Sequence, residues 1–211
     1  MKNFDKSYLS DKIKFIAGVD EAGRGPLAGP VVAAAVIFAD DVFIEGVNDS
    51  KQLSEKERER LFPEIISKAI CVGVASVSHG VIDSINILQS SLLAMKIAVS
   101  RLGQIPDLIL VDGNKSFKSS IPVQTIVKGD SKSFSIAAAS IVAKVTRDRI
   151  MKRLAVHYPE YLWENNKGYA SKYHISAIKK FGATPLHRKT FLTRILNPYH
   201  QNIMEFENES R

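Results

Sequence analysis

Cysteine is almost absent from this chain, and long hydrophobic runs are missing as well. Cys71 is the one cysteine among 211 residues, so the chain can form no internal disulfide and no zinc site built on several cysteines. No stretch approaches the roughly 20 apolar residues that span a bilayer, and residues 1–15 lack the apolar centre of a signal peptide. We therefore expect a soluble, cytoplasmic protein from a reducing compartment, with no membrane contact.

Metal-binding histidine motifs, internal repeats and low-complexity linkers are also missing. The five histidines show no spacing typical of metal ligands, and we interpret them as structural or surface residues. A domain usually takes roughly 100–200 residues, and 45% of this chain is hydrophobic, so we expect a single folded domain over residues 1–211. Its last residues, 198–211, are polar and predict a flexible tail.

Positive charge is in excess. The chain has 29 lysines and arginines against 22 aspartates and glutamates, a net charge of +7. An excess of positive charge indicates a polyanionic partner, and nucleic acid is the first candidate. Many basic proteins that bind no polyanion have the same excess. Basic side chains cluster over 128–153 and 187–189, where some would contact phosphates while most would form solvated helix faces.

The order of apolar segments predicts a mixed sheet covered by helices. Residues 15–19 and 30–38 read as strands joined by a glycine-rich turn over 23–29. Further strands are expected over 71–77, 107–112 and 121–127. Helices are expected over 54–70, 82–102, 133–158 and 171–181, with serine caps at the first and last of these and a loop over 163–169.

Acidic residues follow three of the predicted strands. Asp20 and Glu21 come first, and Asp112 and Asp130 end later strands. Ligands of open α/β sheets tend to bind beyond the carboxyl ends of strands, so these four carboxylates are expected to converge. The alternative is that each acid merely suits a turn, as in Asp112-Gly113; the four together favour a site.

Clustered carboxylates repel one another unless divalent cations lie among them. Oxygen ligands without cysteine or a histidine cluster select Mg²⁺ or Mn²⁺ rather than Zn²⁺. Two such ions can activate a water molecule and stabilise a leaving oxygen, as phosphoryl chemistry requires. The acids therefore indicate metal-dependent phosphoryl chemistry.

The glycine-rich turn is not a known nucleotide-binding loop. Its spacing differs from the dinucleotide fingerprint, a strand rather than a helix follows it, and no Walker A sequence occurs. Backbone amides with Arg24 facing a sugar–phosphate chain are one use for Gly23 and Gly25, and an ordinary tight hairpin is the other. Tyr169 follows Gly168 in a basic segment, where it either stacks on a sugar or base or packs in the core.

Taken together, these residues closely resemble the type 2 ribonucleases H, specifically bacterial ribonuclease HII. The segments that carry the resemblance, in chain order, are GVDEAGRGPLAGPVVAAAV at 18–36, DSKQLSEKER at 49–58, LVDGN at 110–114, VKGDSKSFSIAAASIVAKVTRDR at 127–149, KGYASKYH at 167–174 and TPLHRKTF at 184–191. The related ribonuclease HIII carries an extra N-terminal domain, and only some fifteen residues precede the first strand here, which favours HII.

The resemblance implies an α/β protein with an RNase H-like fold, a mixed five-stranded sheet flanked by helices. It implies cleavage of the RNA strand of RNA–DNA hybrids and nicking on the 5′ side of single ribonucleotides in duplex DNA, with 3′-hydroxyl and 5′-phosphate ends. Residues of about 150–197 would form a small helical, substrate-binding C-terminal part. A monomer acting on nucleic acid in genome maintenance is expected.

Site residues carry over by position. Asp20, Glu21, Asp112 and Asp130 would be the catalytic acids that bind Mg²⁺ or Mn²⁺. The resemblance further implies that the ribose 2′-hydroxyl and its flanking backbone are recognised by Gly23, Arg24, Gly25, Lys51 (at a phosphate) and Tyr169 (stacked on the following deoxyribose). Two other classes stay open: a junction resolvase of the same fold that ignores the sugar, and a non-catalytic nucleic-acid binder with structural acids.

Overall fold

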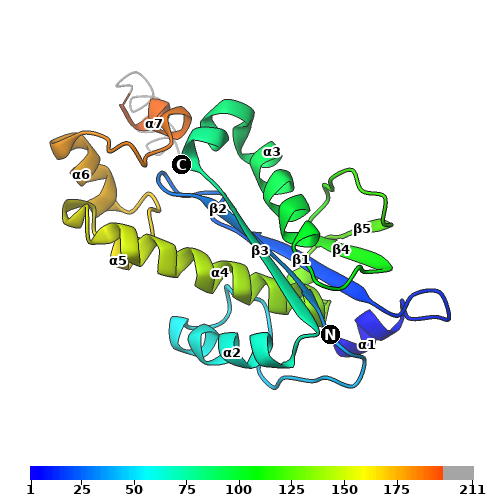
Figure 1. Ribbon diagram of the computed structural model, residues 1–211. Helices are drawn as coiled ribbons and strands as arrows, with labels where there is room; N and C mark the ends of the chain where they lie inside the picture. The colour runs from blue at the N-terminus through cyan, green and yellow to red at the C-terminus, as the bar shows by residue number, and fades with distance from the viewer. Residues whose placement is uncertain (197–211) are drawn as a thin grey trace, which may run out of the picture.

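A twisted five-stranded sheet lies at the centre of the protein (Figure 1), seen in a computed structural model that describes residues 1–196. The strand order is β3-β2-β1-β4-β5. The antiparallel neighbours β1–β2 and β2–β3 form one half, and the parallel neighbours β1–β4 and β4–β5 form the other. The strands are β1 (Ile16–Ala22), β2 (Val31–Ile37), β3 (Cys71–Val77), β4 (Leu108–Asp112) and β5 (Val123–Ile126). The expected mixed five-stranded sheet is confirmed.

Helices cover both faces of this sheet (Figure 1). The helices are α1 (Lys2–Lys6), α2 (Glu55–Lys68), α3 (His79–Ser100), α4 (Phe134–Ala155), α5 (Trp163–Asn166), α6 (Lys172–Phe181) and α7 (Lys189–Leu196), with 3₁₀ turns η1 (Gly129–Ser131) and η2 (Pro159–Tyr161). Helix α4 packs on β1 and β2 from one side, and α3 packs on β3 and β2 from the other. Each face thus has its own apolar core.

Small residues bring α4 unusually close to the central strand. Ala137, Ala138 and Ala139 are fully buried against the sheet. A Cβ atom added at Gly18 of β1 would lie 2.1 Å from the backbone carbon of Ser135. This close approach fixes the start of α4 against the strand that carries Asp20.

Helix caps follow the sequence signals. The side chain of Ser54 accepts a hydrogen bond from Glu57 N, and the Glu57 side chain accepts one from Ser54 N, which completes the predicted capping box of α2. Ser171 caps α6 as predicted. Pro63 lies inside α2, and the helix continues through it.

Three expectations need correction. The 163–169 loop contains the short helix α5, which begins and ends at the left-handed residues Leu162 and Lys167. Strand β1 continues through Asp20 and Glu21 to Ala22, since the glycine turn begins only afterwards, so these acids lie within the strand. Helix α3 begins earlier than predicted, because its cap is Ser78.

Helix α3 also has the length and apolar composition that could cross a membrane, which the sequence pattern alone did not indicate. It is the one such helix within residues 1–196. Its buried residues Ile82, Met95 and Ala98 pack in the apolar core under the sheet. The predicted tail at 198–211 lies outside the described residues.

Candidate active site

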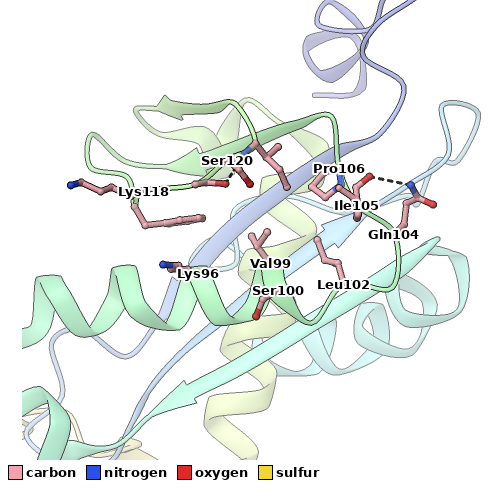
Figure 2. A pocket seen from close by; sticks show the side chains of 12 residues that line it. Lys96, Val99, Ser100, Leu102, Gln104, Ile105, Pro106, Lys118 and Ser120 are labelled. Atoms are coloured by element: carbon pink, nitrogen blue, oxygen red, sulfur yellow. Dashed lines mark hydrogen bonds between the residues drawn. The ribbon is translucent and has the colours of Figure 1, made fainter.

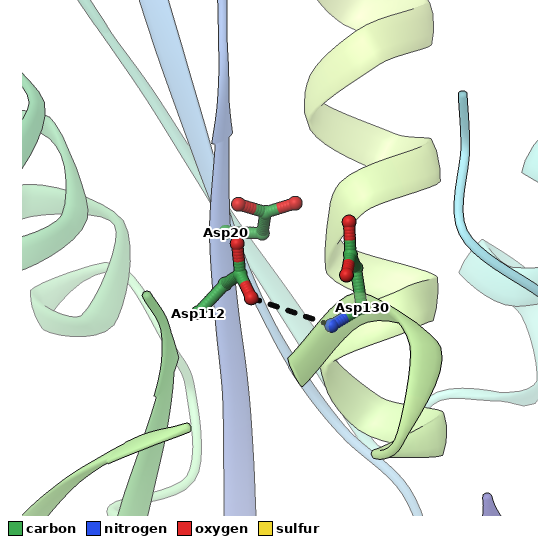
Figure 3. Close-up of side chains that lie close together, drawn as sticks. All are labelled: Asp20, Asp112 and Asp130. Atoms are coloured by element: carbon green, nitrogen blue, oxygen red, sulfur yellow. Dashed lines mark hydrogen bonds between the residues drawn. The ribbon is translucent and has the colours of Figure 1, made fainter. Parts of the chain in front are cut away.

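Three aspartates meet at the carboxyl ends of the two central strands (Figure 3). Asp20 lies in β1 and Asp112 ends β4; the parallel register pairs Val19 with Val111, so the two acids lie on neighbouring strands at the same level. Asp130 enters from the turn η1 just before α4. One carboxylate oxygen from each of the three lies within 4.8 Å of the others.

Backbone amides hold the cluster in place. Asp112 Oδ1 accepts a hydrogen bond from Gly129 N at 2.7 Å. It accepts a second one from Asp130 N at 3.4 Å, which is the dashed line in Figure 3. Gly129 leaves room for this approach, because a Cβ there would lie 3.2 Å from Asp112 Oδ1 and 2.7 Å from Ile136 Cδ1. Asp20 Oδ1 accepts from Glu21 N at 2.7 Å.

Burial makes this site electrostatically unfavourable without a cation. The pKa of Asp20 is raised well above its ordinary value by burial first, then by Glu21 and Asp112, while the hydroxyl of Ser140 and the backbone amide of Glu21 oppose the shift. Burial and then Asp112 also raise the pKa of Asp130. Carboxylates that repel one another in a buried site are a fitting donor set for a hard divalent cation.

Glu21 lies beside the aspartate cluster rather than within it. Its Oε1 atom accepts from Arg24 Nη1 at 3.3 Å. Burial raises the pKa of Glu21, Arg24 opposes that shift, and Asp112 adds to it. The structure therefore brings Asp20, Asp112 and Asp130 together, with Glu21 turned toward the glycine turn.

Lys51 reaches the cluster from the loop before α2. Its Nζ atom lies 3.3 Å from Asp130 Oδ2, while most of the side chain is exposed. Burial acts to lower the pKa of Lys51, but the attraction of Asp130 outweighs it and the pKa is raised. An exposed ammonium group thus stands at the edge of the acidic cluster.

The glycine turn lies against the segment that carries Tyr169. A Cβ atom at Gly25 would lie 3.8 Å from Tyr169 Cε1, and Leu27 N donates to Gly168 O at 2.8 Å. Tyr169 is 42% exposed, so its ring is available to a ligand rather than packed in the core. Arg24, Gly25 and Tyr169 are exposed together next to Glu21, whereas Gly23 is buried beneath them.

Arg147 and Arg188 are functional candidates that the sequence reading missed. The chain pattern placed both in basic clusters, as phosphate contacts or solvated residues, but both are fully buried. Each guanidinium donates to main-chain carbonyls of the glycine turn. In the sequence both arginines stand among other basic and polar residues, and that pattern does not reveal that their side chains are buried.

Two of the histidines are structural, as expected. His174 and His187 are buried, with their Nε2 atoms 3.1 Å apart, and Trp163 Nε1 donates to His174 Nε2 at 3.0 Å. Burial, followed by the neighbouring His174, lowers the pKa of His187 to about 4. His174 Nδ1 lies 2.8 Å from Tyr169 O, which ties this cluster to the tyrosine segment.

A separate cavity of about 610 Å³ lies away from the acids (Figure 2). It lies between the end of α3 and the segment before β5, and both apolar residues, such as Leu102 and Phe117, and polar ones, such as Lys96 and Lys118, line it. None of the candidate site residues lines it.

A mixed sheet of this order, with acids at the carboxyl ends of its central strands, defines a protein of the RNase H-like fold. Residues 17–195 match the family described as Ribonuclease HII. The chain therefore belongs to the ribonuclease HII family and is a ribonuclease H, a nuclease that hydrolyses the RNA strand of RNA–DNA hybrids.

Relatives and solved structures agree with this assignment. The chain is 54% identical over 188 residues to ribonuclease HII of Acetivibrio thermocellus, covering 89% of this chain and 73% of that protein. It is 50% identical over 192 residues to ribonuclease HII of Caldicellulosiruptor saccharolyticus, covering 91% and 94%. Ribonuclease H2 from Pyrococcus horikoshii superposes with a TM-score of 0.71 at 30% identity, covering 90% of this chain and 99% of that chain.

A more distant structure supports the fold alone. Bst-RNase HIII, solved in complex with Mn²⁺, superposes with a TM-score of 0.65 at 19% identity, covering 93% of this chain and 71% of that chain.

Proposed function

We propose that this ribonuclease H nicks duplex DNA on the 5′ side of single embedded ribonucleotides, as well as cutting RNA–DNA hybrids. The observation that supports this most strongly is the adjacency of the aspartate cluster to the surface of Gly25 and Tyr169. Asp20 and Glu21 lie in the last three residues of β1, which ends at Ala22 directly before Gly23. The residues that recognise the ribose would therefore lie beside the acids that catalyse cleavage.

Asp20, Glu21, Asp112 and Asp130 are proposed to hold two divalent cations, Mg²⁺ or Mn²⁺. When bound, the cations supply Lewis-acid stabilisation to the attacking water and the leaving 3′ oxygen, so no side-chain nucleophile is needed. The hydrogen bonds from Gly129 N and Asp130 N orient Asp112 before any cation arrives. Hydrolysis with a leaving 3′ oxygen gives 3′-hydroxyl and 5′-phosphate ends.

Substrate recognition is assigned to the surface next to these acids. The turn of Gly23, Arg24 and Gly25 would contact the ribose 2′-hydroxyl, which is the group that distinguishes RNA from DNA. The exposed ring of Tyr169 would stack on the following deoxyribose. The exposed ammonium of Lys51 would contact a backbone phosphate.

The remaining expectations are part of the same proposal. Residues of about 150–197, which include α5, α6 and α7, would form a substrate-binding part of a single domain. The protein would act as a monomer in the cytoplasm, in the excision of ribonucleotides from DNA.

One assay tests the proposal. Labelled duplexes are incubated with the protein and Mg²⁺: one with a single ribonucleotide, one with an all-RNA strand, one of DNA alone, and a four-way DNA junction. We expect nicking 5′ of the single ribonucleotide and cleavage of the RNA strand, with both DNA substrates intact.

Other outcomes separate the competing functions. Cleavage of the junction would indicate a resolvase. Binding without any cleavage would indicate a nucleic-acid binder with structural acids. Cleavage of the hybrid alone would remove the single-ribonucleotide activity from the proposal.

A further inference from the structure

Two buried arginines lie behind the glycine turn, and both are bonded to the main chain. Arg147 Nε donates to Pro30 O at 3.0 Å, Nη2 donates to Ala28 O at 3.2 Å, and Nη1 donates to Lys167 O at 3.0 Å. Arg147 belongs to α4, so one helix side chain joins the end of the glycine turn to the segment before Tyr169.

Arg188 bonds the other end of the turn. Its Nη2, Nη1 and Nε atoms donate to Gly23 O at 2.6 Å, Arg24 O at 2.9 Å and Gly29 O at 3.0 Å. The two arginines together therefore bond five carbonyls of residues 23–30 and one of the tyrosine segment. We call Arg147 and Arg188 the guanidinium pair.

These arginines are not placed there by carboxylate partners. Asp148, which follows Arg147, pairs instead with Lys144 at 2.8 Å and with Arg58 at 4.0 Å. Burial lowers the pKa of Arg188 to about 9, which leaves it charged at neutral pH. Each guanidinium also faces an aromatic ring, with Arg147 Cζ 5.7 Å from the Tyr169 centroid and Arg188 Cζ 5.1 Å from the Phe191 centroid. A buried charge with no carboxylate partner is costly, which points to a role beyond packing.

The glycines of the turn accommodate this arrangement. Gly23 has a φ of +98°, and a Cβ there would lie 2.0 Å from Arg147 Nε. A Cβ at Gly168 would lie 2.8 Å from Ala28 O. Glycine is thus needed at position 23 to admit the Arg147 side chain, and at position 168, where the tyrosine segment meets the turn.

We propose that Arg147 and Arg188 are positioning residues for ribose recognition, which fix the 23–25 turn at a set distance from Tyr169 without touching the substrate. The inference rests on the proposed function of that surface. A guanidinium has five donors in a rigid plane, whereas an ammonium is a point charge with three rotatable donors. Lysine therefore retains the charge at either position but cannot hold several carbonyls in one plane.

The test uses Arg147→Lys and Arg188→Lys in the full chain. Arg149→Lys is the matched control, because Arg149 lies on the same helix but is exposed and pairs with Glu59. Initial rates are measured in Mg²⁺ on the single-ribonucleotide duplex, and thermal melting is measured for each variant. We expect kcat to fall about 10- to 100-fold with a small change in KM for both pair variants, since misplacement of a bound group mainly slows the reaction step.

A double-mutant cycle separates positioning from simple loss of stability. Arg147→Lys is combined with Tyr169→Ala. If the arginine acts through placement of the tyrosine surface, the double variant should be little slower than the slower single variant. The inference would be overturned if the double variant were slowed by the product of the two single-variant factors. Near-wild-type kcat in both lysine variants would also overturn it.

Folding failure is also decisive. Arg188→Gln and Arg147→Gln, which keep a planar donor, serve where a lysine variant does not fold; if no variant at either position folds, the pair serves stability and the inference is wrong. Failure of the proposed function is distinct, because it would appear as wild-type protein that leaves the single-ribonucleotide duplex intact.

Discussion

Asp20 carries its carboxylate where almost no solvent reaches it, 4% exposed and beside two other acids. Such a residue should matter for catalysis more than for substrate affinity. We expect Asp20→Asn to abolish cleavage in Mg²⁺, because the amide removes one charge from the proposed metal site, while binding of a single-ribonucleotide duplex persists. Gel-based cleavage and fluorescence anisotropy measure the two effects.

Asp41→Asn, at an exposed turn, is the control and should behave like wild type. Near-wild-type turnover of Asp20→Asn would show that the acids do not form the reaction centre.

The same residue should destabilise the metal-free fold at neutral pH. Its folded pKa is raised above the ordinary value of 3.8, so as pH rises the unfolded chain releases this proton first. Stability linked to Asp20 is therefore present below the ordinary pKa and is lost as pH rises through the raised folded pKa.

With a chelator present, Asp20→Asn should consequently melt at a higher temperature than wild type at neutral pH, and the difference should shrink toward pH 4. Circular dichroism melts at the two pH values measure this. A lower melting temperature for the variant at neutral pH would contradict the repulsion inferred here.

Tyr169 is the residue whose aromatic ring faces solvent beside Gly25. We expect Tyr169→Ala to slow cleavage at a single ribonucleotide by about 10-fold or more, since loss of a base–aromatic or sugar–aromatic stack is worth roughly 1–3 kcal/mol. Tyr169→Phe keeps the ring and should stay near wild type. Equal rates for wild type and Tyr169→Ala would assign the ring to packing.

At the scale of elements, the contact of β1 with α4 is the tightest link between sheet and site. We expect Gly18→Ala to lower the free energy of unfolding by about 2 kcal/mol or more, because the new methyl group would overlap the backbone of Ser135 and force the helix away. Denaturant unfolding measures this. Gly103→Ala, where a Cβ meets nothing within 4 Å, is the control and should change stability little.

Most elements could be predicted because their signals are local. The Ser54 capping box and the alternation in residues 71–77 depend on neighbours in the chain, and both were confirmed. Helix α5 was missed because left-handed backbone at Leu162 and Lys167, residues with no special preference for it, sets its ends.

The candidate site was predictable in part for the same reason. Asp20 and Asp112 could be placed together because parallel neighbours align their carboxyl ends. The roles of Arg147 and Arg188 could not be predicted, since their carbonyl partners in the glycine turn and at Pro30 lie more than a hundred residues away in the chain. No residue type marks a main-chain carbonyl as unpaired.

For the whole molecule, a net charge of +7 surrounds a site built from acids. Duplex DNA should therefore be attracted by the surface at large and not by the reaction centre. We expect affinity for an all-DNA duplex of equal length to fall steeply with added salt, because bound cations are released from the phosphates. Anisotropy titrations over a series of salt concentrations test this, and an affinity independent of salt would contradict it.

Helix α4 spans both halves of the proposed site. Ser140, whose hydroxyl opposes the rise in the pKa of Asp20, and Arg147, which bonds the glycine turn, lie seven residues apart on it. Two helical turns, together roughly 10 Å long, thus separate Ser140, next to the acids, from Arg147, which is bonded to the glycine turn. Because α4 holds the acids and the glycine turn at a fixed separation, we expect cleavage at one phosphodiester relative to the recognised ribose rather than at several.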